Sequence, residues 1–143
     1  QIWSPSTRGL IDKVEAVQRQ FSKKLSGLSS YNYNERCIIM GLERLELRRL
    51  RTDLITVYKI LHGLIALTPD ELFSRRDGCI TRGHSYKLVV PESRINCRKY
   101  FFAVRIVNVW NSLPEELVCK NSLSSFTAML KNTCLTSFLN GST

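Results

Sequence analysis

The stretch LERLELRRLRTDLITVYKILHG, residues 42–63, decides the fold. Its apolar side chains recur three and four residues apart, which is the spacing of one face of an α-helix. They are Leu47, Leu50, Leu54, Val57, Tyr58 and Leu61. Gly63 follows the last of them, as glycine commonly does just beyond a helix. The stretch therefore predicts a long amphipathic helix with one face toward a core.

Helical patterns continue before and after this stretch. Residues 11–25 predict a helix. A short helix capped by Asn34 is expected to end at Gly41, and Thr68 followed by Pro69 is expected to begin another. The apolar face expected of the first helix consists of Leu10, Val14, Val17, Phe21, Leu25 and Leu28.

The second half of the chain holds the one break in this pattern. Residues 75–99 contain two Gly and one Pro among polar residues, which favours a loop, and the segments 79–81 and 86–90 could pair as a small hairpin. Residues 99–112 are apolar almost all round a helix, which is typical of a buried one, and a last helix is expected from Ser122. The expected fold is mainly α, a helical bundle with a basic loop or small β-hairpin insertion.

The charge of the chain is concentrated in two segments. The 143 residues carry a formal net charge of +9, and 43% of them are hydrophobic, which suits one globular domain. The excess lies in residues 1–24, with a net charge of +3, and in residues 75–105, with eight basic against two acidic side chains. Such focused charge indicates an acidic polymer as partner, nucleic acid first. No stretch approaches the length of a membrane helix, and the first residue, Gln1, suggests a segment of a longer chain.

The spacing of the Cys, His and Asp residues does not suggest a catalytic or metal-binding site. The five Cys show no short paired spacing of the kind that zinc sites use. The four Asp are all separated, and no glycine-rich phosphate loop is present. A nucleophilic pair of Cys97 and His84 has no support from its spacing. We therefore expect no metal site, no catalytic residue and no cofactor in this chain.

Three arginines align on the expected long helix. Arg44, Arg48 and Arg51 share one side of the helical wheel with Lys59, and no acid stands three or four residues from any of the three arginines. The acids Glu46 and Asp53 lie opposite, at the spacings that suit Arg49. An aligned row of guanidinium groups favours an anionic partner such as a phosphate backbone. The alternative is a solvated face, or one paired with acids elsewhere in the fold.

The segment 75–105 offers a second basic candidate. Its cations are interleaved with Tyr86, Tyr100 and Phe101, a mixture that binds and stacks on single strands. Phe101 is either an exposed stacking residue or an ordinary buried one, and Arg82 either presents its charge from a turn or lies in an ordinary loop. With Phe101 as stacking candidate, the expected nucleic-acid contacts are Lys23, Lys24, Arg44, Arg48, Arg51, Lys59, Arg82, Lys87, Arg98, Lys99 and Arg105.

A set of segments in a fixed order carries a family resemblance. They are IWSP (2–5), IDKVEAVQRQFSKKL (11–25), YNERCIIMGLERLELRRLRTDLITVYKILHG (33–63), TRGHSYKL (81–88), FFAVRIVNVWNSLP (101–114) and SLSSFTAML (122–130). Together they resemble the C-terminal part of a LINE-type, non-LTR retrotransposon reverse transcriptase of the jockey kind. The likeness covers almost the whole chain.

The resemblance implies a place and a role for each part of the chain. Residues 1–74 would be a helical thumb-like region, 75–99 a basic loop or hairpin, and 100–143 helices packed on the first region as one compact unit. The thumb grips a template–primer, so Arg44, Arg48 and Arg51 would be duplex contacts. The catalytic fingers and palm, with their Mg²⁺, would lie upstream, and this chain would be inactive alone.

The partners implied are therefore RNA and DNA as template–primer and the upstream fingers and palm of the same polyprotein, with no membrane. The compartments implied are a cytoplasmic ribonucleoprotein and the nucleus. Two alternatives stay open at this point. The chain could be a helical protein-interaction or packing module of its parent polymerase, or a decayed fragment of a retroelement.

Overall fold

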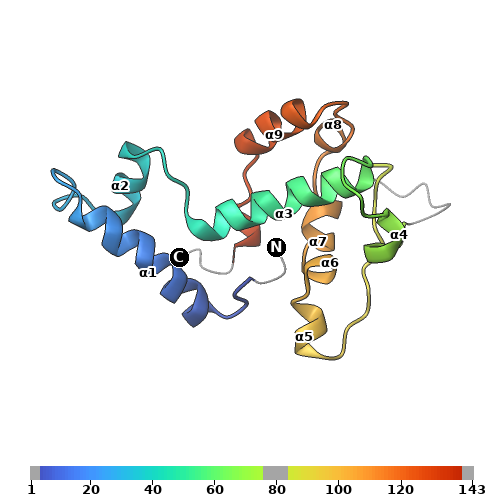
Figure 1. The fold of residues 1–143 in the computed structure, drawn as a ribbon, viewed down its shortest axis with the longest axis horizontal. Coiled ribbons are helices and arrows are strands. Elements are labelled where there is room, and N and C mark those ends of the chain that lie inside the picture. The colour runs from blue at the N-terminus through green and yellow to red at the C-terminus, as the bar shows by residue number, and fades with distance from the viewer. Residues whose placement is uncertain (1–3, 76–83, 140–143) are drawn as a thin grey trace. The chain divides into compact units, whose positions relative to one another are not determined.

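The computed structural model of the chain describes residues 4–75 and 84–139 and is mainly helical, which confirms the predicted fold class (Figure 1). The α-helices are α1 (Arg8–Lys24), α2 (Tyr33–Ile39), α3 (Leu45–Leu61), α4 (Pro69–Leu72), α5 (Asn96–Lys99), α6 (Phe102–Arg105), α7 (Val107–Asn111), α8 (Glu115–Val118) and α9 (Leu123–Asn132). A 3₁₀ turn, η1 (Thr136–Phe138), follows α9. None of the helices in the described ranges is long and apolar enough to cross a membrane.

The expected hairpin in residues 75–99 does not form in the described part of that segment. Arg75 and Leu88 make an isolated antiparallel bridge, and no strand forms over 84–95. The predicted partner strand at 79–81 and the predicted contact Arg82 lie outside the described residues.

Two compact units divide the chain, and the division falls inside α3. One unit consists mainly of Arg51–Cys134, and the other of Pro5–Leu50 with the segment that begins at Leu135. The family resemblance implies boundaries at 74/75 and 99/100. The first turn of α3 belongs with α1 because the buried carboxylate of Glu15 accepts hydrogen bonds from the backbone N–H of Leu45, at 3.0 and 3.3 Å.

Helix α1 forms as predicted, but its buried side is not the predicted apolar face. Val17 and Phe21 are 69% and 59% exposed, whereas Ile11, Glu15 and Ser22 are buried. The predicted face is therefore wrong for this helix. Polar bonds to α2 and α3 decide which side of α1 is covered, and a count of apolar side chains does not detect them.

Helix α2 packs against α1 in the same unit through a buried polar network (Figure 1). Its buried Arg36 donates to the hydroxyl of Ser22 at 3.1 Å and to the carbonyl of Arg19 at 3.3 Å. The Tyr33 hydroxyl donates a hydrogen bond to the carboxylate of Glu15. Burial, followed by this hydrogen bond, raises the pKa of Tyr33 far above its usual value. These bonds satisfy the buried charges at the α1–α2 contact.

The start of α2 corrects the predicted cap. Asn32, rather than Asn34, accepts the N–H of Glu35 at 2.9 Å, and the Glu35 carboxylate accepts the N–H of Asn32 at 2.8 Å. This reciprocal capping box satisfies two donors at once, which a lone cap at Asn34 would not. The helix ends at Ile39, two residues before the predicted Gly41, whose φ of +61° is typical of a glycine just beyond a helix.

In the unit Arg51–Cys134, α3 supplies the centre of the core. Leu54, Val57, Tyr58 and Leu61 of the predicted stripe are buried. The helix ends at Leu61, and Gly63 adopts a φ of +66°. The N–H of Leu64 then bonds the carbonyl of Lys59 at 2.8 Å, and that of Gly63 bonds Ile60 at 3.2 Å, the pattern of a Schellman motif.

The predicted single helix over 99–112 is broken into α6 and α7. Ile106 lies between them, and α5 is a separate turn before them. β-Branched side chains lower helix propensity, and Val104, Ile106, Val107 and Val109 crowd this stretch. The prediction that the segment is buried is confirmed for Phe102, Ala103, Ile106, Val107, Val109 and Trp110. Burial, rather than helix propensity, therefore holds this segment in place.

The last helix, α9, begins as predicted after Ser122. The Ser122 hydroxyl accepts the N–H of Ser125 at 3.2 Å, which caps the helix. Phe126 and Leu130 of its predicted inner face are buried, whereas Cys134, beyond its end, is exposed. Figure 1 shows α8 and α9 side by side, in agreement with the contacts between them.

Candidate nucleic-acid interface

The three aligned arginines of residues 42–63 have different surroundings. Arg48 is exposed and Arg44, just before α3, is half-buried; both belong to the unit Pro5–Leu50. Arg51 belongs to the other unit, where it donates to the carbonyl of Lys131 at 2.8 Å. That carbonyl lies in the last turn of α9, where helices leave carbonyls without a helical partner. Arg51 therefore has a structural role that the wheel did not show.

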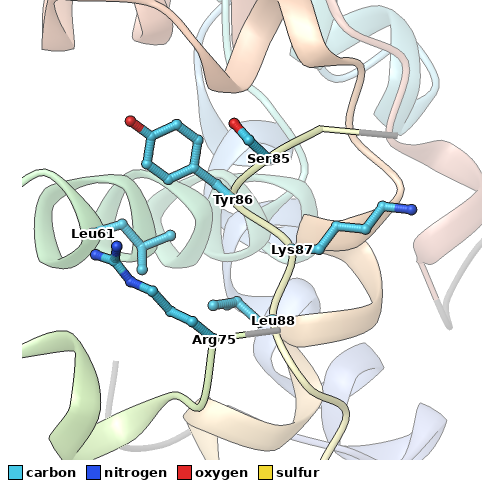
Figure 2. A pocket seen from close by; sticks show the side chains of 6 residues that line it. All are labelled: Leu61, Arg75, Ser85, Tyr86, Lys87 and Leu88. Carbon is cyan, nitrogen blue, oxygen red and sulfur yellow. The ribbon is translucent and has the colours of Figure 1, made fainter. Parts of the chain in front are cut away.

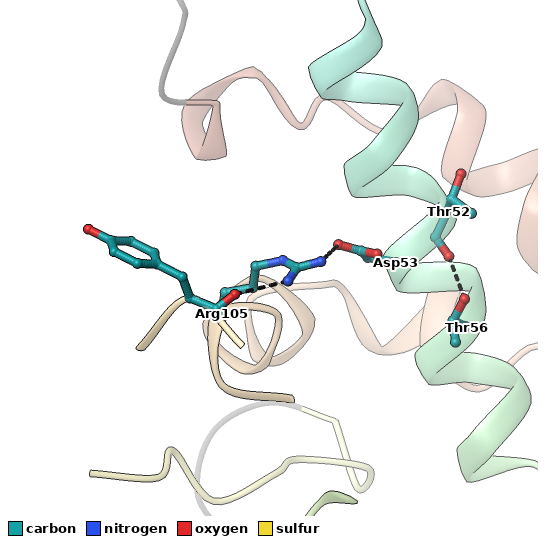
Figure 3. Close-up of polar contacts among 5 residues, drawn as sticks. Thr52, Asp53, Thr56 and Arg105 are labelled. Carbon is teal, nitrogen blue, oxygen red and sulfur yellow. Dashed lines mark hydrogen bonds and ion pairs between the residues drawn. The ribbon is translucent and has the colours of Figure 1, made fainter. Parts of the chain in front are cut away.

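Arg105 also has a structural role, because it forms an ion pair with Asp53 (Figure 3). The two side chains are 19% and 6% exposed, and an Nη atom lies 2.8 Å from a carboxylate oxygen. The other Nη donates to the carbonyl of Tyr100 at 3.0 Å. The wheel assigned Asp53 to Arg49, four residues before it, whereas its partner here lies 52 residues further along. Arg105 thus links α3 to the segment that follows α5.

Helix α5 and the residues on either side of it form an exposed cationic and aromatic surface. It consists of Arg94, Arg98, Lys99, Tyr100 and Phe101, called the α5 surface below, and all five side chains are exposed. Tyr100 is 38% exposed and Phe101 46%, and the Lys99 ammonium lies 5.9 Å from the Tyr100 ring centroid. Of the two alternatives for Phe101, the exposed one is therefore observed.

The charge of the α5 surface is uniform over its length. No acid occurs in residues 93–105, and the nearest one along the chain is Glu92. Three exposed cations within six residues attract a polyanion, and exposed aromatic rings beside them offer faces to bases. The Arg105 guanidinium donates a hydrogen bond to the Tyr100 carbonyl, and this bond restrains the backbone between Lys99 and Phe101.

The other predicted contacts belong to other elements of the fold. Lys23 and Lys24 are exposed in the last turn of α1, where positive charge also favours the helix dipole. Lys59 is half-buried on α3 and lines a cavity of about 520 Å³ that His62 and Ser122 also line. Lys87 borders a second cavity beside Tyr86. Within the unit Arg51–Cys134, Arg98, Lys99 and Phe101 are exposed together on the α5 surface, and Arg105 bonds the Tyr100 carbonyl beside them.

The two histidines both pack against aromatic rings of the fold. In residues 4–75 and 84–139, no three His, Cys, Asp or Glu side chains gather where they could hold a metal ion. His84 is buried, and its Nε2 lies 3.1 Å from the carbonyl of Trp110. Burial lowers the pKa of His84 and likewise that of His62. Burial therefore favours the neutral form of both rings.

Comparison of the chain with protein-family models, curated proteins and solved structures found no match. Two members of the α5 surface, Arg94 and Tyr100, were not among the contacts expected from the sequence, and both are exposed. The signal was available, since both stand in an acid-free run in which three basic residues are followed by three aromatic ones. Their exposure, which decides whether they can reach a ligand, was not encoded in that run.

Proposed function

We propose that this chain is a non-catalytic, nucleic-acid-binding segment of an RNA-directed DNA polymerase of a LINE-type retrotransposon. It holds the template–primer, and the RNA and DNA backbone is its ligand. The observation that carries the proposal is the α5 surface, where three cations and two aromatic rings are exposed together. The ordered motifs of residues 2–130, which resemble that family, supply the parent protein and its upstream fingers and palm.

The chemistry of the α5 surface suits both parts of a template–primer. Arg94, Arg98 and Lys99 neutralise backbone phosphates and release counterions, a contribution that does not depend on sequence. Tyr100 and Phe101 offer stacking faces to unpaired template bases beyond the duplex. Chemistry at Mg²⁺ and the compartments of the ribonucleoprotein and nucleus belong to the parent polymerase in this proposal.

The test is the salt dependence of binding to an RNA template annealed to a DNA primer. The triple variant Arg94→Ala, Arg98→Ala and Lys99→Ala loses three phosphate contacts, so the slope of log Kd against log salt should fall by about 2 to 3. The control removes three charges elsewhere, with Lys13→Ala, Lys120→Ala and Lys131→Ala. Equal slopes for the two variants would show that net charge alone drives binding and would refute the proposal.

An alternative function, a protein-interaction module, is favoured by one observation on α1. Leu10, Val17 and Phe21 are exposed along one side of that helix, at 44%, 69% and 59%. An exposed apolar stripe of this kind can dock on a partner chain or on the parent polymerase. Binding of an acidic control protein as tight as that of the template–primer would favour this alternative over the nucleic-acid proposal.

A further inference from the structure

A cavity of about 270 Å³ lies beside Tyr86, close to the size at which ligand pockets begin (Figure 2). Its walls are Leu61, Arg75, Ser85, Tyr86, Lys87 and Leu88. Figure 2 shows the side chains of Arg75 and Tyr86 on the side where Leu61 lies, whereas Lys87 points away from them. The charged group that faces this cavity is therefore the guanidinium of Arg75.

The wall that carries Tyr86 is fixed by hydrogen bonds to α7. The buried indole N–H of Trp110 donates to the carbonyl of Tyr86 at 2.9 Å. The Asn111 side chain bonds both the N–H and the carbonyl of Leu88, at 2.9 and 2.8 Å. The bridge of Leu88 with Arg75 then joins the two walls of the cavity. A site that is held in this way loses little entropy when it binds a ligand.

Tyr86 is the last ring of a column of four. Phe126 stacks on Tyr58 with centroids 4.3 Å apart, Tyr58 on His62 at 4.0 Å, and His62 on Tyr86 at 5.2 Å. Phe126 and Tyr58 are buried, whereas Tyr86 is only half-buried. The column therefore ends in a ring that is rigidly supported and borders open space.

Arg75 supplies the charge beside that ring. Its side chain is exposed and makes no hydrogen bond or ion pair with another residue in the described ranges. Its positive charge lowers the pKa of His62, an effect smaller than that of burial. Burial favours the neutral imidazole of His62, which the guanidinium does not repel. Arg75 is thus placed for an anion that arrives together with an aromatic ring.

We propose that this cavity binds one nucleotide, with its base stacked on Tyr86 and its phosphate held by Arg75. Leu61 and Leu88 provide the apolar wall against the base, and the planar guanidinium suits two phosphate oxygens. The choice of a nucleotide among aromatic anions rests on the proposed function. The nucleotide is either free or part of the bound strand, since both offer the same base and phosphate.

The experiment titrates the full chain with adenosine monophosphate and follows methyl signals by NMR. The signals of Leu61 and Leu88 should shift, and ribose 5-phosphate, which lacks the base, should shift them far less. Tyr86→Leu should weaken the binding of adenosine monophosphate at least about tenfold, the scale of one stacked base. Tyr86→Phe keeps the ring and should stay within about twofold of the wild type.

Arg75→Gln is the second variant, because an exposed side chain can be replaced without loss of the fold. This variant should weaken the binding of adenosine monophosphate about tenfold and leave the binding of adenosine unchanged. Equal shifts with ribose 5-phosphate, or unchanged binding in Arg75→Gln, overturn the site. Repeating the titration with a short single-stranded RNA shows whether the site takes a free nucleotide or a nucleotide within a bound strand.

The outcome is separable from that of the proposed function. Salt-dependent template–primer binding through the α5 surface, with adenosine monophosphate unaffected by Tyr86→Leu, overturns the cavity site alone. Binding of adenosine monophosphate that depends on Tyr86 and Arg75, in a chain that does not bind template–primer, overturns the proposed function alone.

Discussion

The ion pair between Asp53 and Arg105 gives the sharpest test of the packing. Asp53 is 6% exposed and Arg105 is 19% exposed, so the pair is largely withdrawn from water. Removal of one partner of a buried pair typically costs about 3 to 5 kcal/mol, because the other charge is left uncompensated. Arg105 keeps some water and its bond to Tyr100. We therefore expect Asp53→Ala to lower the free energy of unfolding by about 2 to 3 kcal/mol.

A double-mutant cycle separates this pair from the other contacts of Asp53. Arg105→Met retains much of the side-chain length without the charge, and the double variant removes both charges. The coupling free energy between the two changes should be about 1.5 to 3 kcal/mol. Urea unfolding followed by Trp110 fluorescence, in a Trp3→Phe background, measures it within the unit that holds the pair. A coupling below about 0.5 kcal/mol would refute the structural role of Arg105.

Binding by the Arg105→Met variant decides whether Arg105 contacts the nucleic acid or only supports the α5 surface. As a support it acts through Tyr100, so the folded Arg105→Met variant should retain the slope of log Kd against log salt for a template–primer. Loss of about one unit of that slope in Arg105→Met would restore Arg105 to the set of phosphate contacts.

Three further predictions follow from the core. The pKa values of His62 and His84 are lowered in the fold, so the unfolded chain binds protons first as the pH falls. Stability should therefore decrease below about pH 6.5, seen as a lower urea midpoint at pH 5.5 than at pH 7.5, and an unchanged midpoint would contradict the lowered pKa values. Tyr58→Phe removes the hydroxyl that donates to the carbonyl of Lys120 at 2.5 Å and should cost about 1 to 2 kcal/mol in urea unfolding, whereas no loss would argue against that bond. Gly63→Ala meets open space but must hold a φ of +66°, so thermal unfolding should show a loss of about 1 to 2 kcal/mol, and a gain would mean that the helix end is built differently.

Local sequence rules predicted the helices whose ends are marked by a capping or terminating residue. The stripe from Leu54 to Leu61 is buried, and Gly63 ends α3 with the positive φ that the glycine predicted. Ser122 caps α9 as expected. These features depend on spacing and on single residue types, so they can be read from a few neighbouring positions.

What the sequence did not reveal depends on partners far along the chain. Glu15 accepts a hydrogen bond from Leu45, 30 residues away, and thereby turns α1 so that Val17 and Phe21 are exposed. Asp53 finds Arg105 rather than Arg49. Helical periodicity treats a buried carboxylate as a solvent-facing residue, because it carries no information on which donor will arrive from another element.

The candidate site was predicted in part for the same reason. The basic and aromatic composition of residues 75–105 indicated Arg98, Lys99 and Phe101, all of which are exposed. The aligned arginines were predicted as one row, yet Arg51 binds a carbonyl of α9. A helical wheel shows which residues share one side of a helix, whereas the tertiary fold decides which of them bond to other parts of the chain.

Photocrosslinking to an RNA that carries 5-iodouridine tests the central claim most directly. The RNA is annealed to a DNA primer so that the modified base lies in the single-stranded template beside the duplex. The account predicts adducts on Tyr100 and Phe101, located by mass spectrometry and lost when Arg94, Arg98 and Lys99 are replaced by Ala. Adducts on Phe21 of α1 instead, or adducts on Tyr100 and Phe101 that persist in the triple variant, would contradict it.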